Sequence, residues 1–160
     1  MTFDNSKTII GIRIKLFFAT ILLLAWVGVI YVAKLIKSPI LGLDDSIWTL
    51  ILVIIWIFIA FLPMILNYQF VFYSDDGNDI VFKYFSAGIV GGKKNSVEIN
   101  KGTFAGFKIE SKYFGLNKSM ILFQKLAQGV AKFPPIFISA LTKDQQARLI
   151  HALNQYVPQS

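Results

Sequence analysis

Side chains that commonly carry out catalysis or bind metals are scarce in this sequence. The chain of 160 residues has no cysteine and a single histidine, His151. A metal site needs several ligands at a defined spacing, and a hydroxyl nucleophile needs a neighbouring base. No serine lies in a G-x-S-x-G motif. We therefore expect no metal, no cofactor and no enzymatic activity, and we interpret His151 as a surface or half-buried helix residue.

An acidic segment, Asp75 to Asp79, has side chains that hard cations prefer. It lacks the alternating ligand spacing and the distal glutamate of an EF-hand loop. Asp, Gly and Asn also tolerate the positive φ angles of a tight β-hairpin turn. The segment lies between the runs QFVFYS and DIVFKYF, so the sequence predicts a hairpin turn rather than a calcium site.

A glycine-rich segment, Gly88 to Lys94, partly matches a phosphate-binding loop. That motif requires a glycine where Ala87 stands and a serine or threonine where Lys94 stands. No predicted helix follows to receive a phosphate at its N-terminus. We interpret this segment as a flexible connection between strands.

Lysines are the most prominent feature of residues 69–160, which contain eleven Lys and Arg against six Asp and Glu. One interpretation is a solvated strand face, because lysine keeps strand edges soluble. The other is a cationic surface that faces anionic lipid or an acidic partner, with two aromatic residues of a turn inserted into the membrane interface. The candidate surface for lipid or partner comprises Lys93, Lys94, Lys108, Lys112, Tyr113, Phe114 and Lys118.

Two long apolar runs position this basic region. Eighteen residues from Leu16 to Ala33 and twenty-nine from Ser46 to Ser74 carry no charge, and the mean hydropathy of the chain is +0.59. A bilayer core of about 30 Å requires roughly 20 helical residues. The sequence thus predicts transmembrane spans at about 14–36 and 47–67. The membrane-interface anchors are expected to be Arg13, Lys15, Trp48 and Tyr68.

The first run is longer than the apolar part of a signal peptide, and no small-x-small cleavage site follows it before Lys34. A short connection to the second run predicts antiparallel helices with both termini on one side. Three Lys and Arg precede the first run, and the connection contains two, Lys34 and Lys37. This bias predicts a multi-pass protein of the cytoplasmic (inner) membrane with cytoplasmic N- and C-termini.

The remaining sequence alternates in short apolar and polar runs that indicate six or seven antiparallel strands, forming a barrel or a sandwich. Thr142 and Gln145 form a T-x-x-Q capping box ahead of an amphipathic helix at about 143–156. We expect two parts: residues 1–68, comprising the N-terminal tail and the transmembrane hairpin, and residues 69–160, a β domain closed by this helix. The predicted class is an α+β membrane protein.

The aromatic strands FVFY and IVFKYF after the second run, and the terminal PPIFISALTKDQQARLIHAL, resemble the bacterial membrane-anchored pleckstrin-homology-like (PH-like) proteins. The resemblance covers nearly the whole chain and implies a PH-like β domain with a scaffold or binding role. PH domains that bind phosphoinositides have Lys and Arg around the first hairpin. The acidic residues 75–79 occupy that position here, so the conventional inositide site is not expected.

Three functions follow from these features. The first is a non-enzymatic adaptor or scaffold that positions a protein partner, or an oligomer of its own copies, at the cytoplasmic membrane surface. The alternative is direct binding of anionic lipid headgroups by the lysine-rich face. A small transporter or channel component is disfavoured, because neither apolar run contains a charged residue. Tethering beside a lipid bilayer makes nucleic acid an unexpected partner.

Overall fold

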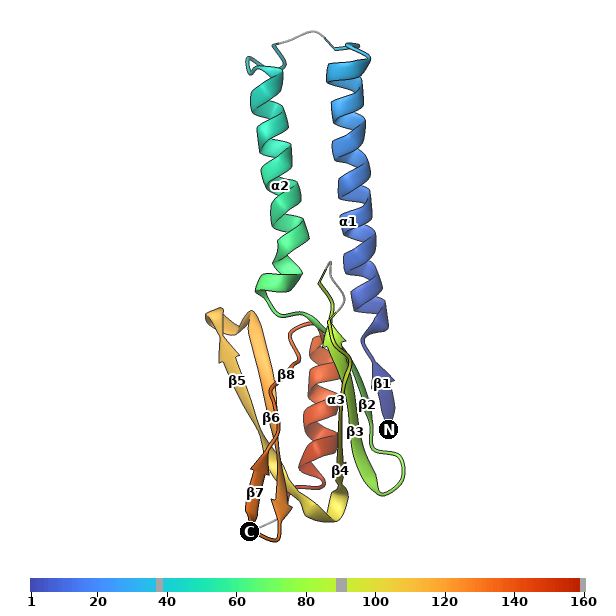
Figure 1. Cartoon of the computed structure of the whole chain (residues 1–160), viewed down its shortest axis with the longest axis vertical. Helices are drawn as coiled ribbons and strands as arrows, with labels where there is room; N and C mark the ends of the chain where they lie inside the picture. The colour runs from blue at the N-terminus through green and yellow to red at the C-terminus, as the bar shows by residue number, and fades with distance from the viewer. Residues whose placement is uncertain (37–38, 89–91, 159–160) are drawn as a thin grey trace. The chain divides into compact units, whose positions relative to one another are not determined.

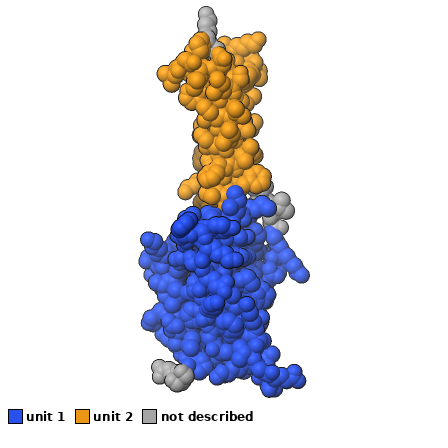
Figure 2. All heavy atoms as spheres, turned by 90° about the vertical axis from the view of Figure 1, so that its left-hand side faces the viewer, with its two compact units in different colours: residues 1–9, 64–160 blue, residues 10–63 orange. Residues whose placement is uncertain are grey.

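The computed structural model describes residues 1–36, 39–88 and 92–158, so Lys37 of the connecting loop and Gly91 of the glycine-rich segment lie outside the described residues. The chain forms two compact units, coloured separately in Figure 2. Residues 1–9 and 64–160 make up what we call the β unit, and residues 10–63 the helical unit. Each unit is described by itself.

The helical unit consists of α1 (Ser6–Val27), which continues as a π-helical turn over Gly28–Val32, and α2 (Asp45–Ile65). Both helices are long and apolar enough to cross a membrane. Large apolar side chains such as Leu22 and Phe58 are exposed along their length. A core helix of a water-soluble protein would bury most of these side chains.

Reciprocal hydrogen bonds join the two helices in antiparallel register. Trp26 Nε1 donates to Thr49 Oγ1 (3.0 Å), and Trp56 Nε1 donates to Thr20 Oγ1 (2.9 Å). Each threonine hydroxyl donates in turn to the carbonyl four residues earlier in its own helix. Each helix therefore contributes one threonine, Thr20 or Thr49, whose hydroxyl group specifies the register against the other helix.

The β unit contains two four-stranded antiparallel sheets and one helix, α3 (Lys143–Asn154) (Figure 1). The first sheet has the order β1-β2-β3-β4: β1 (Thr2–Asp4), β2 (Gln69–Ser74), β3 (Asp79–Ser86) and β4 (Asn95–Asn100). In the second sheet β6 pairs with the other three strands: β5 (Phe104–Lys112), β6 (Asn117–Leu126), β7 (Gly129–Lys132) and β8 (Ile136–Phe137).

Both sheets and α3 contribute to a single hydrophobic core. The first sheet contributes alternate residues of each strand, including Tyr73 and Phe82, and the second contributes Met120 and Leu122. From α3 the core takes Leu149, Ala152 and Leu153, which lie at helical spacing. The predicted capping box is confirmed, because the side chains of Thr142 and Gln145 bond reciprocally to each other's backbone N–H.

The first residues of the chain form part of the first sheet. β1 pairs with β2 in the register Thr2–Ser74 to Asp4–Phe72. Asn5 follows and is only 1% exposed. Its side chain donates to Gln69 O (2.9 Å) and accepts from Val71 N (2.8 Å), and its own N–H donates to Val71 O (3.3 Å). The strand before α1 and the strand after α2 are therefore direct neighbours.

This pairing corrects the division expected from the sequence. Residues 1–68 were assigned to one part, but residues 1–9 belong to the β unit, because β1 completes its first sheet. Of the two predicted arrangements, a barrel or a sandwich, the closed barrel is not observed, since the two sheets remain separate and open over the described ranges. The β2–β3 hairpin predicted around Gly77 is confirmed.

The helix boundaries differ from the predicted spans as well. α1 begins at Ser6, where the Asp4 carboxylate accepts hydrogen bonds from the Ser6 backbone N–H (2.9 Å) and hydroxyl (2.6 Å). These bonds lower the pKa of Asp4 and stabilise the helix start. The first helix ends before Lys34, whose φ of 51° is incompatible with a right-handed helix.

Replacing Asn5 tests the link between β1 and β2. We expect Asn5→Ala to lower the free energy of unfolding of the β unit by about 2 kcal/mol, because the buried Val71 N–H loses its partner. Asn154→Ala, at an exposed position of α3, is the matched control and should change stability by less than about 0.5 kcal/mol. Denaturant unfolding of the full chain in detergent provides the measurement. Equal stability of the two variants would contradict the role given to Asn5.

Replacing the two helix threonines tests the interhelical hydrogen bonds. Thr20→Val and Thr49→Val together should destabilise the helix pair by about 1–2 kcal/mol, because each removes one tryptophan partner. Thr8→Val, in the same helix as Thr20, is the control. Stability is measured by unfolding in mixed micelles, and a double variant as stable as the control would show that the two bonds contribute nothing.

Candidate functional site

Asp75 lies at the centre of a polar cluster at the β2–β3 turn. The carboxylate is 8% exposed and accepts hydrogen bonds from the Tyr73 hydroxyl (3.1 Å), the Tyr156 hydroxyl (3.3 Å) and the Met1 amino group. Lys101 Nζ donates to the Asp75 backbone carbonyl (2.6 Å) and lies 4.8 Å from the centre of the Tyr156 ring. Residues from both ends of the chain thus meet at one carboxylate.

Burial alone would raise the pKa of Asp75, but the hydrogen bonds from the Met1 amino group and the two tyrosines outweigh it and lower this pKa. The same carboxylate and Asp76 raise the pKa of the Met1 amino group. Hydrogen bonds from Thr2 and the amino group lower the pKa of Asp76 to about 2. Both carboxylates are therefore anions near neutral pH and weak bases.

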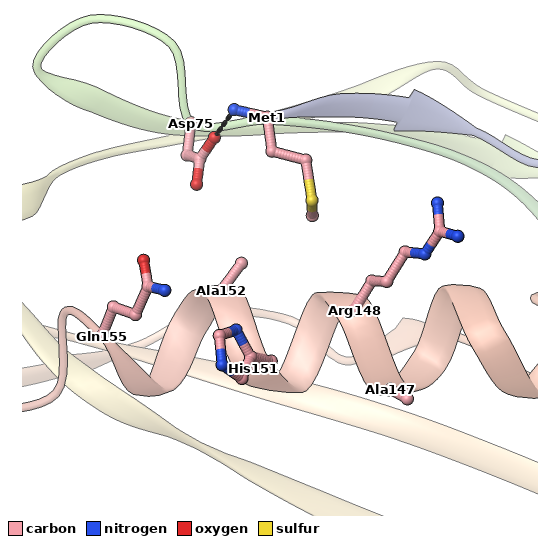
Figure 3. A pocket seen from close by; sticks show the side chains of 7 residues that line it. All are labelled: Met1, Asp75, Ala147, Arg148, His151, Ala152 and Gln155. Atoms are coloured by element: carbon pink, nitrogen blue, oxygen red, sulfur yellow. Dashed lines mark hydrogen bonds and ion pairs between the residues drawn. The ribbon is translucent and has the colours of Figure 1, made fainter.

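A cavity of about 540 Å³ adjoins this cluster (Figure 3). Met1 and Asp75 line it from the ends of β1 and β2, and the rest of its lining comes from α3 and the residue that follows it: Ala147, Arg148, His151, Ala152 and Gln155. His151 is exposed, as expected for a surface helix residue. The Asp75 carboxylate at its edge already accepts hydrogen bonds from three donors.

A second hollow lies on the first sheet, on the face that carries Phe70 and Phe85. The rings of these two residues stack with centroids 4.7 Å apart, and Lys83 Nζ lies 5.9 Å from the centre of the Phe72 ring. The hollow has a volume of about 310 Å³. We call it the aromatic–lysine groove, lined by Phe70, Lys83, Tyr84, Phe85, Lys94, Asn95 and Ser96.

The predicted lysine surface is divided between the two sheets. Lys93 and Lys94 precede β4 of the first sheet, and Lys94 lines the aromatic–lysine groove. Lys108 belongs to β5 of the second sheet. Its Nζ forms a salt bridge with Glu110 Oε1 (3.1 Å), which lowers the pKa of that carboxyl group. A single face formed by all of these lysines is therefore not observed.

The other four predicted surface residues lie together at the β5–β6 hairpin. Lys112 is the last residue of β5, and Lys118 lies near the start of β6, where its Nζ donates to Gln146 Oε1 (3.2 Å). Between them Tyr113 is 65% exposed, and Phe114 is fully exposed. We call residues 113–116 the hairpin tip.

Backbone geometry at the hairpin tip is unusual for aromatic residues. Tyr113 and Phe114 have φ angles of 50° and 54°, and Gly115 follows at 92°. Glycine adopts this region without strain, whereas a bulky residue there costs on the order of 1 kcal/mol or more. Residues with a strained backbone cluster at active sites, ligand clamps and switch regions.

The predicted interface anchors differ in their surroundings. Arg13 and Lys15 are exposed on α1. The indole N–H of Trp48 donates to the Ile40 carbonyl (3.0 Å), which fixes the loop before α2. Tyr68 is half-buried in the β unit, and its carbonyl accepts from the Ala87 N–H (2.8 Å).

Sequence reasoning missed the residues that connect the elements. Asn5 gave no signal, since an isolated asparagine in a short tail has no periodic pattern. Thr20 and Thr49 lie within the uncharged apolar runs, where a hydroxyl side chain is a usable indication of helix pairing. The stacking of Phe70 on Phe85 depends on the β2–β3 register, in which the two residues are directly paired.

No protein-family model, curated protein or solved structure matches this chain. Within the described ranges, no group of three or more His, Cys, Asp or Glu residues could hold a metal ion. The features that remain as candidate sites are the aromatic–lysine groove and the hairpin tip.

Acid titration tests the Asp75 cluster. The pKa of Asp75 is lower in the folded chain than the unfolded value of 3.8, so the ionised carboxylate stabilises the fold above that pH and its contribution is lost as the pH falls. Asp75→Asn should be less stable than the native chain at pH 7 and should lose less stability between about pH 5 and 2. Unfolding curves over this range provide the measurement.

Glu98→Gln, on the exposed part of β4, is the control for this titration. Its stability should follow that of the native chain at every pH. An Asp75→Asn variant that declines as steeply as the native chain would contradict a stabilising role for the Asp75 carboxylate.

Proposed function

We propose that this protein is a non-enzymatic scaffold, anchored in the cytoplasmic membrane by α1 and α2, whose PH-like β unit positions a protein partner or further copies of the chain. The observation that supports this most directly is the pairing of β1 with β2. The chain passes from β1 into α1 and returns from α2 into β2, so the β unit is attached to the helical pair at two adjacent strands.

Attachment at two points restricts the β unit more than a single linker does. A single flexible tether lets a domain explore a volume set by linker length. Here Asn5 alone separates β1 from α1, and only residues 66–68 separate α2 from β2. Such a connection suits a protein whose task is to hold a surface in place.

The aromatic–lysine groove is the surface we assign to partner binding. Phe70 and Phe85 provide an apolar floor, and Lys83 and Lys94 provide positive charge beside it. Aromatic side chains in a hollow contribute strongly to protein interfaces, and neighbouring lysines favour an acidic segment. The proposed partner therefore presents an apolar side chain flanked by acidic residues.

The experiment places a photo-cross-linking amino acid at Ser96, which is exposed and lines the groove. Ser111, exposed on β5 of the second sheet, is the matched control position. In native membranes we expect a discrete cross-linked product from position 96 and none from position 111. Lys83→Glu combined with Lys94→Glu should reduce that product.

Two results would overturn the scaffold proposal. One is a position 96 that yields no more product than position 111. The other is a purification from gently solubilised membranes that recovers neither a reproducible partner nor an oligomer.

A further inference from the structure

The hairpin tip exposes three large apolar side chains. Phe114 is fully exposed, and Tyr113 and Leu116 are 65% and 63% exposed. Scattered apolar residues are common on protein surfaces, but these three belong to a single four-residue turn. Such a patch indicates contact with another apolar phase.

A series of contacts inside the β unit locates this tip. Gln69, the first residue of β2, accepts at its side-chain oxygen from the Phe137 N–H (3.0 Å). Phe137 is paired with Ser119 of β6, and the Ile138 N–H donates to the Lys118 carbonyl (2.8 Å). β6 begins immediately after the tip. The tip therefore projects from the end of the β unit at which the chain enters β2 from α2, as Figure 1 also shows.

Two lysines lie beside the hairpin tip. Lys112 and Lys118 occupy neighbouring pairs of the β5–β6 ladder, so they extend on opposite faces of the hairpin below the tip. The acidic turn of Asp75 and Asp76 is at the far end of β2 from Gln69. Anionic lipid attracts Lys112 and Lys118 beside the tip, while the carboxylates of Asp75 and Asp76 lie beyond the other end of β2.

We propose that the hairpin tip inserts the side chains of Tyr113, Phe114 and Leu116 into the interfacial layer of the bilayer that α1 and α2 cross. This inference rests on the membrane anchoring proposed above. Aromatic side chains favour the interfacial region, and lysines beside them remain among the headgroups. The tip thereby gives the β unit a third contact with the membrane, additional to its two chain connections.

A protein partner fits the tip less well than a lipid surface does. Stable protein interfaces bury about 800 Å² on each partner, with a well-packed centre. Three side chains on a narrow turn provide much less area. Insertion into lipid needs no complementary shape, and even a few apolar side chains contribute when the rest of the chain is already held at the membrane.

The absence of cysteine from the sequence makes site-specific labelling simple. The full chain is prepared as three single variants, Phe114→Cys, Leu126→Cys and Phe58→Cys, each carrying an NBD fluorophore. Leu126 is the matched control, because it is 56% exposed and lies at the other hairpin of the second sheet, β6–β7. Phe58, 62% exposed in the middle of α2, reports on membrane anchoring itself.

The labelled chains are placed in nanodiscs of phosphatidylglycerol and phosphatidylcholine, in which both faces of the bilayer are accessible. Nitroxide-labelled phosphatidylcholine then quenches fluorophores in contact with lipid, and iodide quenches those in water. We expect lipid quenching at positions 58 and 114, and iodide quenching without lipid quenching at position 126. Replacing phosphatidylglycerol with phosphatidylcholine should weaken lipid quenching at position 114 and leave position 58 unchanged.

Each alternative outcome contradicts a different statement. If position 58 is not quenched by lipid, the proposed membrane anchoring is wrong, whatever happens at the tip. If position 58 is quenched and position 114 behaves like position 126, only the insertion of the tip is wrong. If position 114 is shielded from iodide but not quenched by lipid, a protein surface covers the tip, and the lipid contact is overturned.

Discussion

The antiparallel pairing of β1 with β2, completed by the buried side chain of Asn5, is the constraint on which the rest of the structure depends. An amide buried to this degree must satisfy its hydrogen bonds inside the protein, and Asn5 does so on the backbone of β2 alone. Two neighbouring strands of the sheet, β1 and β2, are therefore joined in sequence through the two helices α1 and α2. A fragment of residues 69–160 would lack an edge strand and leave the β2 backbone groups at Gln69 and Val71 without their partner.

The β unit is polarised between its two ends. Its far end is organised around the Asp75 carboxylate, which holds the Met1 amino group, β2 and the residue Tyr156 beyond α3 in one hydrogen-bonded cluster. Its other end carries the chain connections to the helices, the hairpin tip and several lysines. Within the β unit, the hydrogen-bonded cluster at Asp75 and the exposed aromatic residues of the hairpin tip therefore lie at opposite ends.

The helical unit combines a largely apolar exterior with specific polar contacts between its helices. Hydrophobicity alone gives little preference for one helix register over another in lipid, because the tails are as apolar as the side chains. The bonds from Trp26 to Thr49 and from Trp56 to Thr20 provide that preference. The polar groups of these four side chains are therefore used between the helices themselves.

The sequence by itself determined the features that depend on local pattern: two long apolar helices, the β2–β3 hairpin at Gly77, and the capped helix that begins after Thr142. Each of these arises from residues close together in the chain, where periodicity, turn preference and capping act directly. Tertiary structure alone decided the position of β1, the hydrogen bonds of Asn5, the separation of the lysines between two sheets, and the exposure of Phe114. These depend on pairing between residues distant in sequence, and a three-residue strand with one asparagine has too little pattern of its own to reveal its partner.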